Sequence, residues 1–154
     1  MGAFMERLVS SVLQASKKVK TYTALSSGSV SVSFSAARYI KEKTRLTSTS
    51  KILVLGAGKI GRNTCKNLLG YFPSENITIM NRSLEKAMNV AKELNVNYVH
   101  TEFLSSQIEA ADVILVATSS TEPVILKSHL LNSGKKIILD LSIPCNVEAG
   151  VIDL

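Results

Sequence analysis

Lys51–Gly61, with the sequence KILVLGAGKIG, is the stretch that decides the fold of this chain. Within it, Ile52–Leu55 is a short unbroken apolar run, which is typical of a strand buried on both faces of a parallel sheet. The run leads directly into Gly56–Gly61, whose glycines have the spacing G-x-G-x-x-G. A strand, this glycine spacing and then a helix together form the phosphate-binding turn of dinucleotide-binding folds. The stretch therefore predicts a nucleotide site at the carboxyl end of the first strand of an α/β sheet.

Each glycine of this turn has its own physical task. Gly56 makes the tight turn, Gly58 lets the backbone approach a pyrophosphate, and Gly61 allows the helix to pack closely on the strand. The N-terminus of the following helix offers unpaired N–H groups and a partial positive charge to the phosphates. We expect cofactor contacts from the whole turn: Gly56, Ala57, Gly58, Lys59, Ile60 and Gly61.

The second part of the nucleotide site follows the second predicted strand, Ile77–Met80. NAD-binding folds usually place an Asp or Glu here, which binds the ribose 2′-hydroxyl. This chain instead has Asn81, Arg82 and Ser83. A guanidinium and a hydroxyl can donate hydrogen bonds to a 2′-phosphate, which a carboxylate would repel. The sequence therefore favours NADPH over NADH. The plainer alternative is a solvated Arg82 and an N-cap Ser83 for a helix over 84–94.

Length and composition are those of one ordinary globular domain with an appendage. The chain has 154 residues, of which 45% are hydrophobic and 19% are charged. No apolar run approaches the roughly 18 residues that span a bilayer, and the first residues lack a signal-peptide pattern. Cys65 and Cys145 form neither a CxxC motif nor a disulfide framework, which fits a reducing compartment. We therefore expect a cytoplasmic protein without a membrane partner.

The net charge of +6 is concentrated in the N-terminal third of the chain. Residues 1–51 contain nine Lys and Arg against two Glu, whereas the remainder is nearly balanced. Such a segment can face a nucleic acid. The alternative is a helix with a lysine-rich solvated face, which the lack of interleaved aromatic residues favours.

The first fifty residues predict helices and a linker. Residues 4–20 have the apolar spacing of an amphipathic helix. Residues 30–43 begin with strand-like alternation and end with helical spacing, and we interpret them as a helix because a lone strand would have no partner. Thr44–Ser50, rich in Ser and Thr, predicts a linker. We therefore divide the chain into a helical connecting segment, 1–48, and a nucleotide-binding domain, 49–154.

From residue 51 onwards, predicted strands and helices alternate. This order indicates an α/β fold with a doubly wound parallel sheet of the Rossmann type, to which the N-terminal helices form an appendage. The expected strands are 51–55, 76–80, 97–100, 112–117 and 136–141, and the expected helices are 59–70, 83–94, 103–109 and 124–131.

Two further segments follow predicted strands at the edge where such sheets bind ligands. Ala117–Thr121 has small hydroxyl residues that leave room and donors for a ribose or a nicotinamide. Asp140–Pro144 ends the last strand. We expect cofactor contacts from Ala117, Thr118 and Ser119. The alternative is that both segments are turns rich in Ser, Thr and Pro.

With these motifs in this order, the chain resembles the glutamyl-tRNA reductases, NADPH enzymes that open five-carbon tetrapyrrole (porphyrin) biosynthesis. Ala15–Thr21, ASKKVKT, is similar to the family's stretch A-K-x-V-R-T-E-T, and Gly28–Val32 is similar to its motif G-x-V-S-V. The glycine turn, Asn81–Ser83, Ala117–Ser119 and Asp140–Pro144 then follow in the family's order. The glycine turn and Asn81–Ser83 alone are shared with shikimate dehydrogenases.

The resemblance implies an oxidoreductase that passes hydride from NADPH to a glutamyl thioester and gives glutamate-1-semialdehyde. In that family, an N-terminal domain with a nucleophilic cysteine accepts glutamyl from glutamyl-tRNA, and a helical C-terminal domain forms the homodimer. The chain resembles only the middle part, so the resemblance implies an NADP-binding fragment that is inactive alone. Its implied task is to hold the cofactor and aim its nicotinamide. We assign it no catalytic and no metal-binding residue.

A few residues depart from the family pattern. Cys145 stands where the family usually has Arg, and Lys20 and Tyr22 replace Arg and Glu, which affects local loop contacts. Cys65 lies on the apolar side of its predicted helix and is interpreted as a packing residue. No histidine or helix N-terminus is evident beside Cys145, so we expect no reactive thiolate there.

Other functions fit parts of the sequence. A shikimate-dehydrogenase-like NADP oxidoreductase would share the glycine turn and Asn81–Ser83, but residues 1–50 offer no substrate domain for it. A non-catalytic nucleotide-sensing module usually has an acidic residue where Asn81 or Arg82 stands, and a methyltransferase needs one after the second strand. The reductase domain fits more of the chain than these alternatives.

Overall fold

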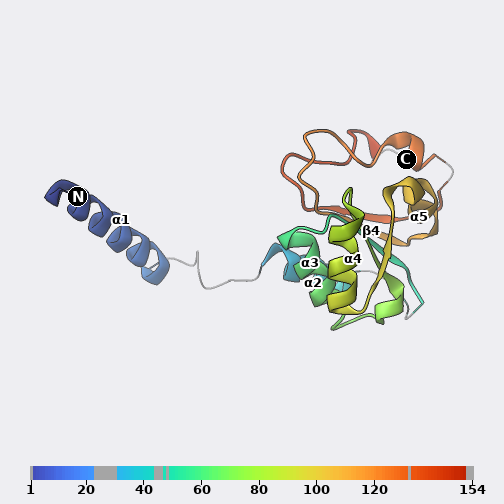
Figure 1. Ribbon diagram of the computed structural model, residues 1–154, viewed down its shortest axis with the longest axis horizontal. Helices are drawn as coiled ribbons and strands as arrows, with labels where there is room; N and C mark the ends of the chain where they lie inside the picture. Colours follow the sequence, from blue (N-terminus) through green and yellow to red (C-terminus); the bar gives the residue numbers. More distant parts are fainter. Residues whose placement is uncertain (1, 23–30, 44–46, 48, 132, 152–154) are drawn as a thin grey trace. The chain divides into compact units, whose positions relative to one another are not determined.

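The computed structural model describes residues 2–22, 31–43, 47, 49–131 and 133–151 (Figure 1). Its contacts divide the chain into two compact units, Met1–Ser31 and Val32–Leu154. We describe each unit by itself.

The first unit contains one described helix, α1, over Ala3–Tyr22. This helix confirms the one predicted over 4–20, and apolar side chains such as Leu8 and Val12 are exposed along it. The motif at Gly28–Val32 lies mostly outside the described residues. Among the helices that the structure describes, none is both long enough and apolar enough to cross a membrane.

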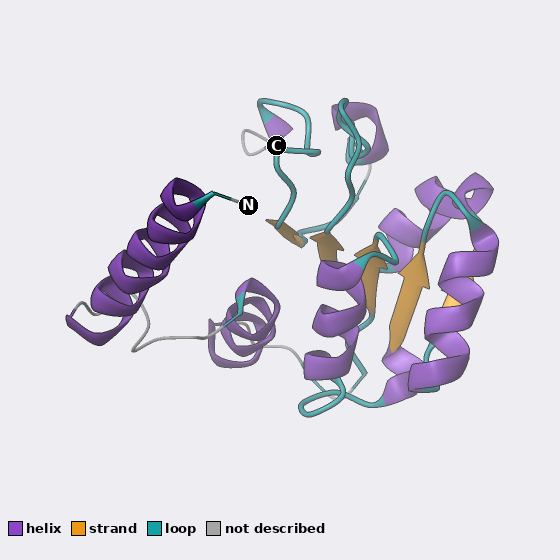
Figure 2. Cartoon of the chain, turned by 60° about the vertical axis from the view of Figure 1, so that its left-hand side comes forward, coloured by secondary structure: helices purple, strands orange, loops and turns teal. Residues whose placement is uncertain are grey.

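The second unit is built on a sheet of five strands. They are β1 Ile52–Leu55, β2 Ile77–Met80, β3 Asn97–Val99, β4 Val113–Val116 and β5 Ile137–Asp140. The strand order is β3-β2-β1-β4-β5 and all neighbours are parallel, so the strand arrows in Figure 2 point the same way. β1 lies between β2 and β4, and the strand order therefore reverses at its carboxyl end, where open α/β sheets bind ligands. The predicted Rossmann-type fold is confirmed.

Helices cover both faces of this sheet. They are α2 Val32–Lys43, α3 Lys59–Leu68, α4 Leu84–Leu94 and α5 Leu104–Ala110, with 3-10 turns η2 Ser74–Asn76, η3 Thr101–Phe103 and η4 Lys127–His129. Ile52 and Val54 of β1 join the core with α2, α3 and α4, whereas Leu53 and Leu55 join the core with α5. This alternation follows from the two-residue period of a strand. Figure 1 accordingly shows α2, α3 and α4 together and α5 apart from them.

Helix α2 confirms the helical interpretation of residues 30–43 as far as they are described. Ala37 and Ile40 are completely buried in the core that α3 also joins. The Ser33 hydroxyl donates a hydrogen bond of 3.2 Å to the Ile60 carbonyl in the first turn of α3. The apolar side of α2 is therefore part of the nucleotide-binding unit.

The domain boundary expected between residues 48 and 49 differs from the division by contacts, which falls between Ser31 and Val32. The Ser- and Thr-rich composition of the predicted linker suggested that α2 belongs with the N-terminal helix. Its buried side chains instead attach it to α3. Most of that linker, residues 44–46 and 48, lies outside the described residues.

The helix predicted over 124–131 is wrong. Val124 and Ile125 both donate their amide hydrogens to the Asn146 carbonyl, at 2.7 and 3.1 Å, and Ile125 pairs with Val147 in an isolated bridge. The backbone is therefore extended at the start of this segment. Only the short turn η4, Lys127–His129, is helical.

Candidate functional site

A cavity of about 850 Å³ lies at the carboxyl ends of β1, β2 and β4. The structure brings every predicted site residue except Gly61 to its wall. Those residues are Gly56, Ala57, Gly58, Lys59, Ile60, Asn81, Arg82, Ser83, Ala117, Thr118 and Ser119. Ser120, from the predicted segment Ala117–Thr121, lines it as well. Residues that were not predicted to contact a ligand also line it, namely Leu55, Met80, Lys86, Thr101, Leu104 and Val124.

Two glycines of the turn are required by the fold itself. Gly56 has a φ of +109°, and a Cβ on it would lie 2.2 Å from the Ala117 carbonyl oxygen. Its amide donates to the Met80 carbonyl at 2.8 Å, which ties the turn to β2. A Cβ on Gly61 would lie 1.8 Å from the Gly56 carbonyl oxygen. Gly61 therefore lies behind the turn and allows α3 to pack closely, as its spacing predicts.

Gly58 differs from both of these glycines. A Cβ on Gly58 would have no described atom within 4 Å, and its backbone is in the ordinary extended region at φ −76°. The fold therefore does not require a glycine at this position. Gly58 is the N-cap of α3, and no side chain caps the amides of the first turn. The open space in front of Gly58 is available to a ligand that accepts hydrogen bonds from these amides.

The end of β2 forms one side wall of the cavity. The Asn81 side chain accepts a hydrogen bond from the Ala57 amide at 3.1 Å and donates one to the Ser83 carbonyl at 3.1 Å, so its amide group holds the glycine turn to the start of α4. Ser83 is the N-cap of α4, and its hydroxyl accepts a long bond of 3.5 Å from the Lys86 amide. Of the residues in this motif, Arg82 is the one left to interact with a ligand.

Two basic side chains, those of Arg82 and Lys86, line this wall. Arg82 is exposed, and its guanidinium forms no hydrogen bond or ion pair within the described part of the chain. Lys86 lies in the first turn of α4 and lines the same cavity. Lys86 was not among the predicted site residues, although its place in the first turn of the helix that follows Asn81–Ser83 was a usable signal. Among the residues that the structure describes, no carboxylate lines this cavity, so the local charge suits a phosphate.

Arg62, a basic residue of α3 near the glycine turn, is already paired. The Arg62 Nε donates to the Glu93 carboxylate at 2.8 Å, and a second bond joins the same two side chains. Hydrogen bonding to Arg62 lowers the pKa of Glu93, and the same bond raises the pKa of Arg62. This exposed pair links α3 to α4, which leaves Arg82 and Lys86 as the side-chain cations at the β2 wall.

The opposite wall of the cavity is the loop after β4. The Ala117 amide donates to the Leu55 carbonyl at 2.8 Å, and the Thr118 amide donates to the Ser142 hydroxyl at 3.2 Å. The two segments predicted at the ends of β4 and β5 are thus brought together. The Thr118 hydroxyl donates to the side chain of Asn146, a completely buried residue that the sequence analysis did not single out.

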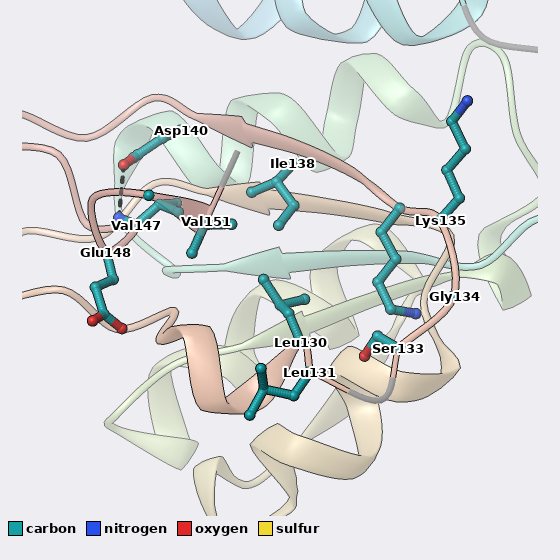
Figure 3. Close-up of a pocket in the computed structure, with 12 residues that line it drawn as sticks. Leu130, Leu131, Ser133, Gly134, Lys135, Ile138, Asp140, Val147, Glu148 and Val151 are labelled. Atoms are coloured by element: carbon teal, nitrogen blue, oxygen red, sulfur yellow. Dashed lines mark hydrogen bonds between the residues drawn. The ribbon is translucent and has the colours of Figure 1, made fainter. Parts of the chain in front are cut away.

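A second depression, of about 1010 Å³, lies beside β5 (Figure 3). Lys136, on its wall, donates to the carbonyls of Glu109 and Ala111, both at 2.7 Å. Glu148, also on its wall, accepts from the Lys127 amide at 2.7 Å. These charged groups serve the fold, and the glycine turn does not reach this depression.

Neither cysteine lines the first cavity. Cys65 is completely buried in α3, and burial raises the pKa of its thiol to about 12, which agrees with a packing role. Cys145 is exposed in the loop after β5. Among the described residues, no cluster of His, Cys, Asp and Glu could hold a metal ion.

Residues 38–154 match the model of the family described as Shikimate / quinate 5-dehydrogenase. The glutamyl-tRNA reductase of Flavobacterium psychrophilum is 45% identical to this chain over 153 residues. That match covers 99% of this chain and 37% of the relative. The chain therefore spans little more than a third of the length of the curated relatives that it matches.

Two solved structures have the same fold. The glutamyl-tRNA reductase from Methanopyrus kandleri has a TM-score of 0.72 and is 24% identical, with 100% of this chain and 40% of that chain covered. The nucleotide binding domain of a glutamyl-tRNA reductase from Thermoplasma volcanium has a TM-score of 0.64 and is 26% identical. That match covers 80% of this chain and 83% of the solved domain.

Proposed function

Since this chain belongs to the Shikimate / quinate 5-dehydrogenase family, we propose that it binds NADPH and serves as the NADP-binding domain of a glutamyl-tRNA reductase. The observation that carries the cofactor choice is the exposed Arg82, with Lys86 beside it, where NAD-binding folds have a carboxylate. The observation that favours this reductase is the 45% identity over the whole chain.

The residues of the cavity fit the parts of this cofactor in order. The first turn of α3 offers its amides to the pyrophosphate, and Gly58 leaves the space that a Cβ would fill. Arg82 and Lys86 neutralise and bind the 2′-phosphate. On the other side of the turn, Ala117, Thr118 and Ser119 face the half that carries the nicotinamide. When bound, NADPH supplies the hydride for reduction of a glutamyl thioester to glutamate-1-semialdehyde.

The remaining parts of the proposal follow from the family. The partner is glutamyl-tRNA, presented by the catalytic domain of the whole enzyme, which acts as a homodimer in the cytoplasm. The proposed role of residues 1–48 is to connect this domain to the catalytic one, and that of residues 49–154 is to bind NADP. No residue of this chain is proposed as catalytic.

One specific observation favours a second candidate, a shikimate-dehydrogenase-like NADP oxidoreductase. The family model that matches residues 38–154 carries that description. The relatives named glutamyl-tRNA reductase, however, also match the region before residue 38, because they cover 99–100% of the chain. Because this match covers more of the chain, we favour the glutamyl-tRNA reductase over the shikimate-dehydrogenase-like enzyme.

A chimeric enzyme tests the proposal. The matching third of the Flavobacterium psychrophilum reductase is replaced by this chain, and glutamate-1-semialdehyde is measured with glutamyl-tRNA and NADPH. We expect product from the chimera, none from the chimera with Gly58→Val, and none from the 154-residue chain alone. A folded chimera that binds NADPH but makes no product would contradict the assignment to this reductase. Turnover by the chain alone, lost on Cys145→Ser, would make Cys145 the nucleophile instead.

A further inference from the structure

Asn146 is a completely buried polar residue whose side chain is fully engaged with one loop. Its Nδ2 donates to the Ser120 carbonyl at 3.0 Å and to the Glu122 carbonyl at 3.3 Å. Its Oδ1 accepts the hydroxyl hydrogen of Thr118. Three groups of the loop after β4 are thus bonded to one buried amide, which fixes the course of that loop.

Asp140, the last residue of β5, fixes Asn146 in turn. One of its carboxylate oxygens accepts from the amides of Asn146 and Val147, at 2.6 and 3.0 Å, and Figure 3 shows the second of these bonds. The other oxygen accepts from the Ser142 amide at 2.9 Å. The Ser142 hydroxyl, which is buried, accepts from the Thr118 amide. Charge-assisted bonds from three amides make this a stiff support for the neighbouring loop.

The supported loop is one wall of the cavity. Thr118, Ser119 and Ser120 line it, whereas Asp140, Ser142 and Asn146 do not. Because β4 and β2 lie on opposite sides of β1, this wall lies across the cavity from the wall that carries Arg82. A dinucleotide whose 2′-phosphate lies at the β2 wall has its nicotinamide half at the β4 wall.

We propose that Asn146, held by Asp140, is a positioning residue that presets the loop Thr118–Ser120 for the nicotinamide half of NADPH. The inference rests on the proposed function, because it takes NADPH as the ligand of this cavity. Asn146 acts through the loop and does not touch the cofactor. Its loss therefore weakens contacts to the nicotinamide half and leaves contacts to the adenosine 2′-phosphate unchanged.

The test compares two probes on the full 154-residue chain: NADPH, and 2′,5′-ADP, which has the 2′-phosphate but no nicotinamide. Asn146→Leu keeps the approximate size of the side chain and removes its hydrogen bonds to the loop. We expect NADPH to bind about tenfold more weakly, with a smaller rise in nicotinamide fluorescence on binding. Binding of 2′,5′-ADP should change by less than about twofold.

Matched variants separate positioning from folding. Asn97→Leu loses a 2.7 Å bond to the Glu75 carbonyl but lies on β3, away from the cavity wall, and should alter neither affinity. Ser142→Ala removes only the second tie to Thr118 and decides the question where Asn146→Leu does not fold. We expect it to weaken NADPH selectively as well.

The outcomes distinguish this proposal from the one on which it rests. A folded Asn146→Leu chain that binds NADPH as wild type does, or that weakens both probes equally, would overturn the positioning role alone. If the Asn146→Leu variant does not fold, unchanged NADPH binding by the Ser142→Ala variant would overturn the positioning role. A wild-type chain that binds neither probe would overturn the proposed function, and the positioning role with it.

Discussion

Arg82 is the residue to which we assign the proposed discrimination between NADPH and NADH. It is exposed, lines the cavity and stands where a ribose-binding carboxylate is usual. We expect Arg82→Ala to cost about 1.5–3 kcal/mol of NADPH binding, the usual contribution of charge-assisted hydrogen bonds, and to cost little for NADH. Isothermal titration with both cofactors measures this difference. Lys92→Ala, on α4 and outside the cavity, also removes one positive charge and should leave both affinities unchanged.

At Gly58 the fold leaves space for a side chain, whereas we expect the bound dinucleotide to fill that space. The Cβ position is open, so Gly58→Val should keep the unfolding temperature within about 2 °C of wild type while NADPH binding is lost. Gly61→Ala is the opposite case, because its methyl group would meet backbone at 1.8 Å and destabilise the chain. Thermal melts and cofactor titrations of both variants separate these effects. A folded Gly58→Val chain with normal NADPH binding would show that the phosphates lie elsewhere.

Because of Cys65, we expect the free energy of unfolding of the chain to decrease at alkaline pH. Burial raises the pKa of its thiol from 9.0 to about 12, whereas the thiol in the unfolded chain keeps its ordinary pKa. Above about pH 9 the unfolded state therefore holds fewer protons than the folded state. The contribution of the buried thiol is complete below pH 9 and is lost as the pH rises towards 12, by about 1.4 kcal/mol per pH unit.

Urea unfolding between pH 8 and 10 measures this loss. We expect the free energy of unfolding to fall less steeply with pH in Cys65→Ala than in wild type. Cys145→Ala, at an exposed position, should retain the wild-type slope. Equal slopes in all three proteins would mean that Cys65 is accessible to solvent.

At the scale of elements, we predict that α2 belongs to the nucleotide-binding unit and stabilises it. Ile40 is completely buried in the core shared with α3, so Ile40→Ala should lower the free energy of unfolding by about 2–5 kcal/mol. Tyr39, on the same helix, is 50% exposed, and Tyr39→Ala should cost less than about 1 kcal/mol. Urea titrations compare the two variants. Similar small effects would place α2 outside the folded unit.

Elements that are defined by local patterns were predictable from the sequence. The apolar runs at Ile52–Leu55 and Ile77–Met80 indicated strands because both faces of a central strand are buried. The glycine spacing indicated the turn because Gly56 and Gly61 meet steric limits that nearby residues impose. The prediction of a helix over 124–131 was wrong because a contact distant in sequence determines the backbone there. The start of this segment is bonded to Asn146, about twenty residues further along the chain, which no local pattern reveals.

The candidate site was predictable to a similar degree. The residues of the glycine turn and of the β2 end follow directly from motif spacing, and all but Gly61 line the cavity. The separate roles of Asn81, Arg82 and Ser83 were harder to predict from the sequence. Asn81 proves to be bonded to Ala57 and Ser83, and the support by Asp140 and Asn146 depends on contacts between two separate loops. Such long-range polar contacts have no signature in a single sequence.

At the scale of the whole molecule, the basic excess and the cavity are distributed differently along the chain. The basic excess lies in residues 1–51, whereas the cavity and the residues that support its wall lie between Leu55 and Asn146. The chain spans little more than a third of the length of its curated relatives, and neither Cys65 nor Cys145 lines its cavity. Under the proposed function, we therefore expect this chain to bind the cofactor and the other domains of the whole enzyme to perform acyl transfer.

The central claim is that these 154 residues bind NADPH in preference to NADH. Titration of the purified wild-type chain with each cofactor, followed by nicotinamide fluorescence, tests this claim most directly. We predict a Kd for NADPH at least about tenfold below that for NADH, since the 2′-phosphate gains charge-assisted hydrogen bonds from Arg82 and Lys86. Equal affinity for the two cofactors, or tighter binding of NADH, would contradict the claim.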